Sequence, residues 1–282
     1  MTYNILHEAV RTLMPPWTVR GPLVAGVIRS AHADVVCLQE VSPRQLHDLA
    51  RDLPEYQFFS GRLSGGTRLP RWAAPVAGVL KFILGDFYGR GENCPILVRS
   101  GFGMPVGSGS LPLGRGVGRG ATPYRGGAGR SPTPHVVNWV RIELPDGRTL
   151  DVFNTHLGHM PWTARSTAET LLRIAGGQWD GGPQILAGDF NTMPFSTLVH
   201  ALTTNGSPGV PAFEDAFAHG RARTGGGVTF HWGLGLPGPR IDYVLVRAPC
   251  VVDSVIVTGK RVGRTLPSDH YAVVVDLRLV GP

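Results

Sequence analysis

Short apolar runs spread over the whole chain are each flanked by acidic, amide or imidazole side chains. Val35–Leu38, for example, leads into Glu40, and Ile185–Ala187 leads into Asp189. The full set of such polar residues is Asn4, Glu40, Asn154, His156, Asp189, Asn191, Asp242, Asp269 and His270. If the runs are strands that end at one edge, the acids and amides supply hard oxygen ligands for Mg²⁺ or Mn²⁺. The imidazoles and amides beside them supply hydrogen-bond donors for phosphate oxygens.

Each of these residues taken singly has an ordinary explanation. Asn4 suits a turn, and Glu40 precedes an expected helix start, where an acid is favourable. Gly188–Asn191 consists largely of turn formers, and Asp242 beside Arg240 suits a surface ion pair of little energetic worth. Solvated loops or a strand start account in the same way for His156, His159 and Ser268–His270. Chance does not account for the whole set at strand ends, so we interpret it as one site.

The hydrophobic pattern mixes short β-branched runs with a few helical stretches. It predicts strands at Thr2–Leu6, Asp34–Gln39, Pro95–Arg99, Val136–Glu143, Thr149–Asn154, Gln184–Ala187, Ile241–Val246, Val251–Thr258 and Tyr271–Leu277. It predicts helices at about Thr18–Ala31, Pro43–Arg51, Trp162–Ala175 and Phe195–Leu202. Asp146-Gly147 supplies the positive φ of a tight turn, which indicates a hairpin between the fourth and fifth strands.

Hairpins with scattered helices do not suit a doubly wound parallel sheet. They favour an α/β (α+β) four-layer sandwich, in which two antiparallel-rich mixed β-sheets pack face to face with helices outside. We expect one domain over residues 1–282. Within it, residues 101–134 are dominated by Gly, Pro, Ser and Arg, and bury too little apolar surface to fold alone. We predict an insertion loop there; the alternative is a basic flap over an anionic substrate, because Tyr124–Gly127 resembles nucleic-acid-binding RGG segments.

The net charge of +7 and the pI of about 9.8 favour anionic partners, such as nucleic acid or a phosphorylated lipid or small molecule. Only two of the 27 basic residues are lysine, so compositional bias also explains the charge. Three cysteines without paired spacing argue against a disulfide framework and a zinc knuckle. Neither a signal peptide nor a bilayer-spanning run is apparent, which favours a cytoplasmic monomer. A start upstream of Met1, with a leader, is the alternative.

The polar motifs occur in an order that resembles the DNase-I-like endonuclease/exonuclease/phosphatase family. The ordered set is Tyr3-Asn4-Ile5, Leu38-Gln39-Glu40, Asn154-Thr155-His156-Leu157, Gly188-Asp189-Phe190-Asn191, Arg240-Ile241-Asp242-Tyr243 and Ser268-Asp269-His270. The match runs from residue 2 to about residue 277 and so covers nearly the whole chain. Weaker matches support it at Gly91–Leu97, Arg165 and Thr229–His231. The resemblance implies the sandwich fold and a divalent-metal-dependent phosphoesterase.

The resemblance also implies a role for each matched residue on the metal and water side of the reaction. Glu40, assisted by Asn4, would bind Mg²⁺ or Mn²⁺. Asp269 would lie close to the metal and to the neighbouring imidazole. Asp189 would orient or deprotonate the attacking water.

On the phosphate side, the resemblance implies that Asn191 holds the phosphate and that His156 and His270 contact its oxygens. Asp242 would orient the imidazole of His270. Further substrate contacts are implied for His159, Arg165 and His231. Gly158 stands where many members of the family have aspartate, which predicts altered substrate contacts.

The implied function is a phosphoesterase of nuclease-like type, acting on a phosphodiester or phosphomonoester. A phosphoinositide or phospholipid phosphatase, or a sphingomyelinase-type phosphodiesterase, is the alternative with the same site. A catalytically dead phosphate-binding module is a further alternative, although such a protein is expected to have lost a core ligand. Val41-Ser42 after Glu40 differs from the Thr-Lys of exonuclease III-like repair enzymes, which argues against abasic-site repair.

Overall fold

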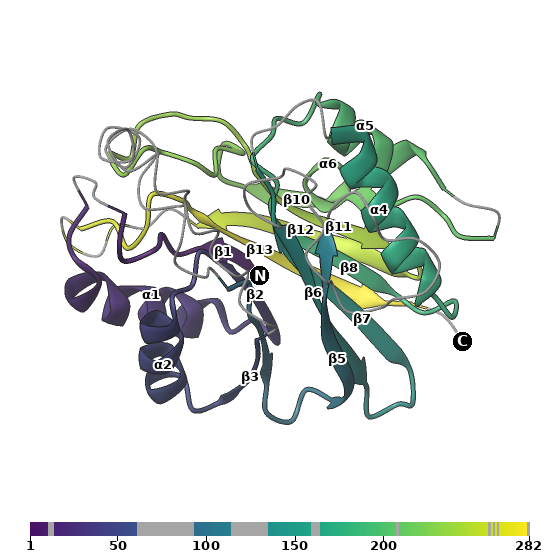
Figure 1. Ribbon diagram of the computed structural model, residues 1–282, viewed down its shortest axis with the longest axis horizontal. Coiled ribbons are helices and arrows are strands. Elements are labelled where there is room, and N and C mark those ends of the chain that lie inside the picture. The colour runs from purple at the N-terminus through teal and green to yellow at the C-terminus, as the bar shows by residue number, and fades with distance from the viewer. Residues whose placement is uncertain are drawn as a thin grey trace, which may run out of the picture.

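The computed structural model describes residues 1–10, 14–60, 93–113, 135–158, 164–206, 209–258, 261, 263 and 265–280. Within these ranges two mixed β-sheets pack face to face, with helices on their outer sides (Figure 1). The interface between the sheets is apolar and contains Ile96 and Val255 from one sheet and Val152 and Val244 from the other. This arrangement confirms the predicted four-layer sandwich.

The first sheet has seven strands in the order β10-β12-β13-β1-β2-β4-β3. Its strands are β1 (Thr2–Asn4), β2 (Val35–Gln39), β3 (Tyr56–Phe59), β4 (Ile96–Arg99), β10 (Ala222–Thr224), β12 (Cys250–Thr258) and β13 (Ala272–Leu279). β1 pairs in parallel with β2 and antiparallel with β13. The carboxyl ends of β1 and β2 and the amino end of β13 therefore meet at one edge.

The second sheet has six strands in the order β5-β6-β7-β8-β11-β9. Its strands are β5 (Met104–Leu113), β6 (His135–Glu143), β7 (Thr149–His156), β8 (Gln184–Asp189), β9 (Glu214–Asp215) and β11 (Asp242–Arg247). β7 and β8 are parallel, and β11 runs antiparallel to β8. The carboxyl ends of β7 and β8 thus meet the amino end of β11.

Two helices cover the outer face of each sheet. α1 (Trp17–Ala31) and α2 (Pro43–Asp52) pack on the first sheet, where Ile28 and Leu49 are fully buried. α4 (Ala164–Gly177) and α5 (Thr197–Thr204) pack on the second sheet, and a short α6 (Ala216–His219) follows β9. α2 begins at a capping box, in which the Ser42 hydroxyl and the Gln45 side chain exchange hydrogen bonds with each other's backbone. None of the described helices is long and apolar enough to cross a bilayer.

The hairpin predicted around Asp146-Gly147 is confirmed, because β6 and β7 pair from Glu143 and Thr149 onwards and Gly147 has a φ of 83°. The loop predicted over residues 101–134 is wrong for its first third. β5 forms a full ladder with β6, and its backbone hydrogen bonds stabilise a strand that the Gly- and Pro-rich sequence obscures. A side chain at Gly109 would meet the Trp139 ring at 2.8 Å, so glycine there lets the indole lie over the strand. Residues 114–134, and with them the possible basic flap, lie outside the described residues.

Asn154, on β7 of the second sheet, forms a buried polar link to the first sheet. Its side-chain NH₂ donates to the carbonyl oxygens of Leu38, Cys94 and Pro95 at 2.8, 3.1 and 3.0 Å. Its Oδ1 accepts from Gln39 Nε2 at 2.7 Å. Every polar atom of this fully buried amide is therefore satisfied, and the contacts fix the position of the β2 end relative to β7.

We expect Asn154→Ala to destabilise the fold by about 3 kcal/mol, because it leaves buried carbonyls and the Gln39 amide without partners. Urea unfolding monitored by circular dichroism measures this change. Asn205→Ala, at an exposed position after α5, is the matched control and should stay within about 0.5 kcal/mol of the unmodified chain. Equal stability of the two variants would contradict the role given to Asn154.

Candidate active site

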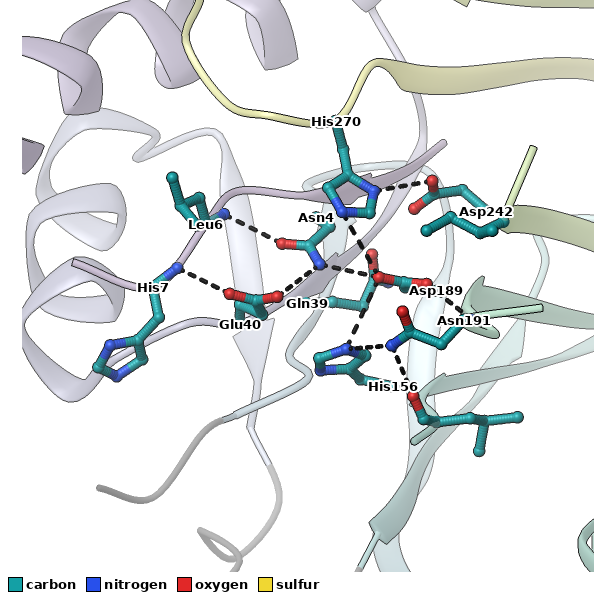
Figure 2. Close-up of polar contacts among 12 residues, drawn as sticks. Asn4, Leu6, His7, Gln39, Glu40, His156, Asp189, Asn191, Asp242 and His270 are labelled. Carbon is teal, nitrogen blue, oxygen red and sulfur yellow. Dashed lines mark hydrogen bonds and ion pairs between the residues drawn. The ribbon is translucent and has the colours of Figure 1, made fainter. Parts of the chain in front are cut away.

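The strand edges described above bring the predicted polar residues together in space. The register pairs Asp189 with His156 on β7 and with Asp242 on β11. Asn4 ends β1 and Glu40 directly follows β2, and both of these strands belong to the other sheet. The side chains converge where the two sheets face each other (Figure 2). The fold therefore brings Asn4, Glu40, His156, Asp189 and Asp242 together.

The Asn4 side chain lies at the centre of this cluster. Its Nδ2 donates to Glu40 Oε1 at 3.0 Å and to Asp189 Oδ2 at 3.0 Å. Its Oδ1 accepts from the Leu6 backbone N–H at 3.0 Å, which fixes the orientation of the amide. All three side chains of the Glu40–Asn4–Asp189 chain are buried. One neutral amide thus holds two carboxylates that would otherwise repel each other.

Glu40 adopts a backbone conformation that few non-glycine residues take, with a φ of 59°. This left-handed geometry turns its side chain away from the strand direction of β2 and towards Asn4. The second carboxylate oxygen accepts from the His7 backbone N–H at 3.1 Å. Strained conformations of this kind persist only where surrounding contacts stabilise them, and they are frequent at functional sites.

His270, just before β13, lies between two carboxylates. Its Nδ1 is 2.9 Å from Asp242 Oδ2, and its Nε2 is 3.7 Å from Asp189 Oδ2. Burial lowers the pKa of His270, but the charges of Asp242 and Asp189 outweigh burial and hold that pKa well above its usual value. The Phe230 ring packs against the imidazole with centroids 4.9 Å apart. The two carboxylates thus favour the protonated form of His270, and the Phe230 contact restrains its ring plane.

His156 and Asn191 line the other side of Asp189. His156 Nε2 is 3.6 Å from Asp189 Oδ2 and 3.0 Å from Asn191 Nδ2. Asn191 Nδ2 also donates to the Leu157 carbonyl at 2.7 Å, and the Asn191 backbone N–H donates to Asp189 Oδ1 at 2.9 Å. Asn191 has a φ of 50°, a left-handed conformation that asparagine tolerates better than most residues. This turn places amide and imidazole donors on one side of the carboxylate.

Asp189 is the most heavily contacted acid of the site. Burial raises its pKa to about 6, and the neighbouring charge of Asp242 acts in the same direction. The imidazoles of His270 and His156 oppose the increase, as does the hydrogen bond from Asn4. Because its pKa lies near neutrality, the group can exchange a proton under ordinary conditions, as a general base requires.

The cluster carries a surplus of buried negative charge. Its acids are Glu40, Asp189, Asp242 and Asp269, and none of them forms an ion pair with a lysine or an arginine in the described part of the chain. Ligand atoms of Glu40, His156 and Asp189 all lie within 4.8 Å of one another. Buried carboxylates need a compensating cation, and oxygen-rich donors suit Mg²⁺ or Mn²⁺. The residues present therefore fit a divalent ion.

The remaining predicted residues differ in how they relate to this cluster. Asp269 is half-buried beside His270; burial raises its pKa, and the charge of Glu40 adds to the increase. His231 is fully buried and donates its backbone N–H to the Asp269 carbonyl at 2.9 Å, so it lies behind the site and not at its open side. Arg165, on α4, is 84% exposed and pairs with Glu169, away from the cluster. His159 lies outside the described residues.

Sequence reasoning missed residues that act through the backbone. The His7 N–H binds Glu40, yet no side-chain motif marks that position. The Ser268 hydroxyl donates to the Asn4 carbonyl at 2.7 Å and so links the first and last motifs. The Arg20 guanidinium binds backbone carbonyls beside the first and the last motif. The only sequence signal for this role is an arginine on the apolar face of α1, which also carries Val24 and Ile28.

Comparison with known proteins finds a protein family whose model matches this chain. A model of the Endonuclease/Exonuclease/phosphatase family matches residues 1–270. Among solved structures, an endonuclease/exonuclease/phosphatase from Bacteroides vulgatus is 23% identical, with a TM-score of 0.80, and the alignment covers 99% of this chain and 97% of the other. No curated protein matches the chain.

Two further solved structures share the fold. A mannosyl-6-phosphatase from Bacteroides thetaiotaomicron is 22% identical with a TM-score of 0.75, over 99% of this chain and 98% of the other. TDP2 from D. rerio, complexed with a single-strand DNA product, is 15% identical with a TM-score of 0.68, over 98% and 97% of the two chains. At these identities the similarity concerns the fold alone.

We expect Asp242→Asn to lower the pKa of His270, because the substitution removes the carboxylate charge that stabilises the imidazolium. A pH titration of the histidine ring signals by NMR, on the metal-free protein, measures the change. Asp253→Asn is the control, because Asp253 pairs with Arg278 on the surface of β12. An unchanged His270 titration in Asp242→Asn would show that the pair does not set the protonation of the ring.

Proposed function

The chain belongs to the endonuclease/exonuclease/phosphatase family, and we propose on that premise that it hydrolyses its phosphate ester with the help of a divalent ion, Mg²⁺ or Mn²⁺. Members of this family are phosphoesterases, so the reaction class follows from membership. The observation that carries the proposal is the buried Asn4 amide, which holds Glu40 and Asp189 at 3.0 Å each. Two imidazoles lie within 3.7 Å of the same Asp189 oxygen.

The size of the barrier explains why so many groups converge. Hydrolysis of a phosphate ester requires a barrier reduction on the order of 20 kcal/mol. One general acid or base contributes about 10²–10⁴-fold, which corresponds to about 3–6 kcal/mol. Most of the stabilisation therefore comes from preorganised charge around the phosphoryl group. The rigid hydrogen-bond network described above is the kind of scaffold that keeps such charges in place.

Glu40, Asn4 and Asp269 are the residues that would hold the ion. They come from the first sheet and its following segments. Glu40 and Asp269 contribute the carboxylates of this acid-rich side of the cluster, and Asn4 faces Glu40 through its Nδ2. A bound divalent ion would neutralise negative charge on the phosphoryl and leaving oxygens. The Asn4 amide keeps Glu40 in place for this task through its 3.0 Å hydrogen bond.

The second sheet supplies the groups for water and phosphate. Asp189, with donors on both oxygens, is positioned to orient a water molecule and accept its proton. Asn191 and His156 lie on the same side, where they would exchange the 3.0 Å contact between Asn191 Nδ2 and His156 Nε2 for hydrogen bonds to phosphoryl oxygens. His270, held by Asp242 at 2.9 Å, adds a positive charge facing the same space.

We propose a nuclease-like substrate, a nucleic-acid phosphodiester, as the first candidate. Trp232 is 60% exposed, and its ring packs edge-on against Phe230, which in turn packs on His270. This ladder of rings leads from the site to the surface and offers a face on which a base can stack. The net charge of +7 also favours a polyanionic substrate such as nucleic acid.

A phospholipid or phosphoinositide is the second candidate. Phe195, on the segment that follows Asn191, is 99% exposed, and Met193 beside it is also exposed. Apolar side chains in such positions fit a lipid surface as well as a nucleobase. The two candidates share the phosphoryl chemistry and differ only in what surrounds the phosphate.

Hydrolysis of an aryl phosphodiester and an aryl phosphomonoester tests the reaction. We expect turnover with Mg²⁺ or Mn²⁺, none with EDTA, and a fall in kcat of at least about 10²–10⁴-fold in Asp189→Asn. Asp253→Asn is the control and should retain normal activity, because Asp253 lies on the surface of β12. Full turnover in EDTA would remove the metal from the proposal, and near-normal Asp189→Asn would remove the role of that carboxylate.

Trp232→Ala separates the substrate classes. For a single-stranded oligonucleotide we expect KM to rise about tenfold, because the substitution removes the stacking of one base, which contributes about 1–3 kcal/mol. We also expect oligonucleotide binding to weaken steeply as the salt concentration rises. Val280→Ala, at an exposed apolar residue just after the end of β13, should leave KM unchanged. No turnover of oligonucleotides, together with hydrolysis of phosphoinositide in vesicles, would favour the lipid candidate.

A further inference from the structure

Arg20, in the first turn of α1, is a buried arginine that none of the steps above employs. Only 2% of its surface is exposed, and it lies on the helix face that also buries Val24 and Ile28. Arginine remains charged in proteins, and a buried guanidinium ordinarily pairs with a carboxylate. Among the described residues, however, no acid forms an ion pair with it. Its burial therefore calls for a physical explanation.

The guanidinium of Arg20 is held by backbone carbonyls. Nε donates to Pro15 at 2.9 Å, Nη1 donates to Ile5 and Pro267 at 2.8 Å each, and Nη2 donates to Leu6 at 3.0 Å. The group thus makes four of the hydrogen bonds that its five N–H donors allow. Its fixed planar fork is rigid, so the carbonyls it joins are held at fixed relative positions.

Three of the four carbonyls, those of Ile5, Leu6 and Pro267, belong to the two segments that carry the acid-rich side of the site. Ile5 and Leu6 lie between Asn4 and His7, the two residues that donate to the Glu40 carboxylate. The Pro267 carbonyl belongs to the segment that continues through Ser268 to Asp269 and His270. Ile5 and Pro267 lie more than 250 residues apart in the sequence. Arg20 Nη1 joins them, because it binds the Ile5 carbonyl 15 residues before it and the Pro267 carbonyl 247 residues after it.

The charge of Arg20 also reaches the site. Burial lowers the pKa of its guanidinium, and the charges of Tyr3, Asp269, Glu40 and Glu8 oppose that decrease. Asp269 and Glu40 are two of the residues that would hold the ion. Arg20 therefore offsets part of their mutual repulsion from a buried position.

We propose that Arg20 is a positioning residue of the metal site, which sets the distance between the Asn4–His7 segment and the Asp269 segment through its carbonyl contacts. It touches neither the ion nor the substrate. The inference rests on the proposed function, because it assumes that Glu40 and Asp269 bind a divalent ion. It goes further in assigning the geometry of that site to a residue on a helix that contributes no ligand.

Mn²⁺ affinity tests the proposal without turnover. Calorimetric titration of the metal-free, folded protein is compared for the unmodified chain, Arg20→Met, Arg20→Lys and Arg29→Met. We expect Arg20→Met to bind Mn²⁺ about 10–100-fold more weakly, as loss of groups that orient metal ligands generally does. Arg20→Lys keeps the charge but not the planar fork, so its Mn²⁺ affinity should lie between those of the unmodified chain and Arg20→Met. Arg29→Met, on the exposed side of α1, should bind normally.

Thermal melting of each variant identifies the temperatures at which all of them are folded. A residue needed only for stability would lower the melting temperature and leave Mn²⁺ affinity unchanged, and that result would overturn the proposal. If Arg20→Met does not fold, Arg20→Lys decides: weaker Mn²⁺ binding supports the positioning role, and unchanged binding overturns it. An unmodified chain that binds no Mn²⁺ would instead overturn the metal part of the proposed function, and this inference with it.

Discussion

The hydrogen bonds from one asparagine side chain join the two halves of the site. Asn4 Nδ2 donates to Glu40, which follows β2 of the first sheet, and to Asp189, which ends β8 of the second. An amide can place one N–H on each of two carboxylates, whereas an acid at this position would repel both and a cation would neutralise the site. The face-to-face packing of the sheets brings the carboxylates close, and this amide holds both of them in place through hydrogen bonds of 3.0 Å.

Much of the fold, and the strand ends at which the polar residues of the candidate site lie, could be predicted from the sequence, because strand ends carry a local signal. The hairpin around Gly147, the parallel ends that present Asp189 and the four main helices follow from periodicity and turn chemistry. β5 was missed because glycines and prolines hide a strand whose stability comes from its ladder with β6 and from the Trp139 ring over Gly109. Neither feature is visible in the local sequence.

The supporting residues were missed for a different reason. Asn154 was expected only as part of a motif, yet its side chain binds the carbonyl of Leu38 on β2 and those of Cys94 and Pro95 just before β4. Arg20 binds carbonyls from segments far apart in the chain. Backbone acceptors have no identity in the sequence, so contacts to them cannot be predicted by matching residue types. What the sequence does show is the anomaly itself: a charged or polar residue on an apolar face.

The division of the site between the sheets affects how the activity arises during folding. Glu40 and Asn4 belong to the first sheet, while Asp189, Asn191 and His156 belong to the second, and the hydrogen bond between Asn4 and Asp189 closes a loop of 185 residues. With the roles proposed above, a partly folded chain with one sheet formed has the acid for an ion or the acid for water, but not both. Hydrolytic activity would then require both sheets to be formed and packed against each other, and an incompletely folded molecule would be harmless to the phosphate esters around it.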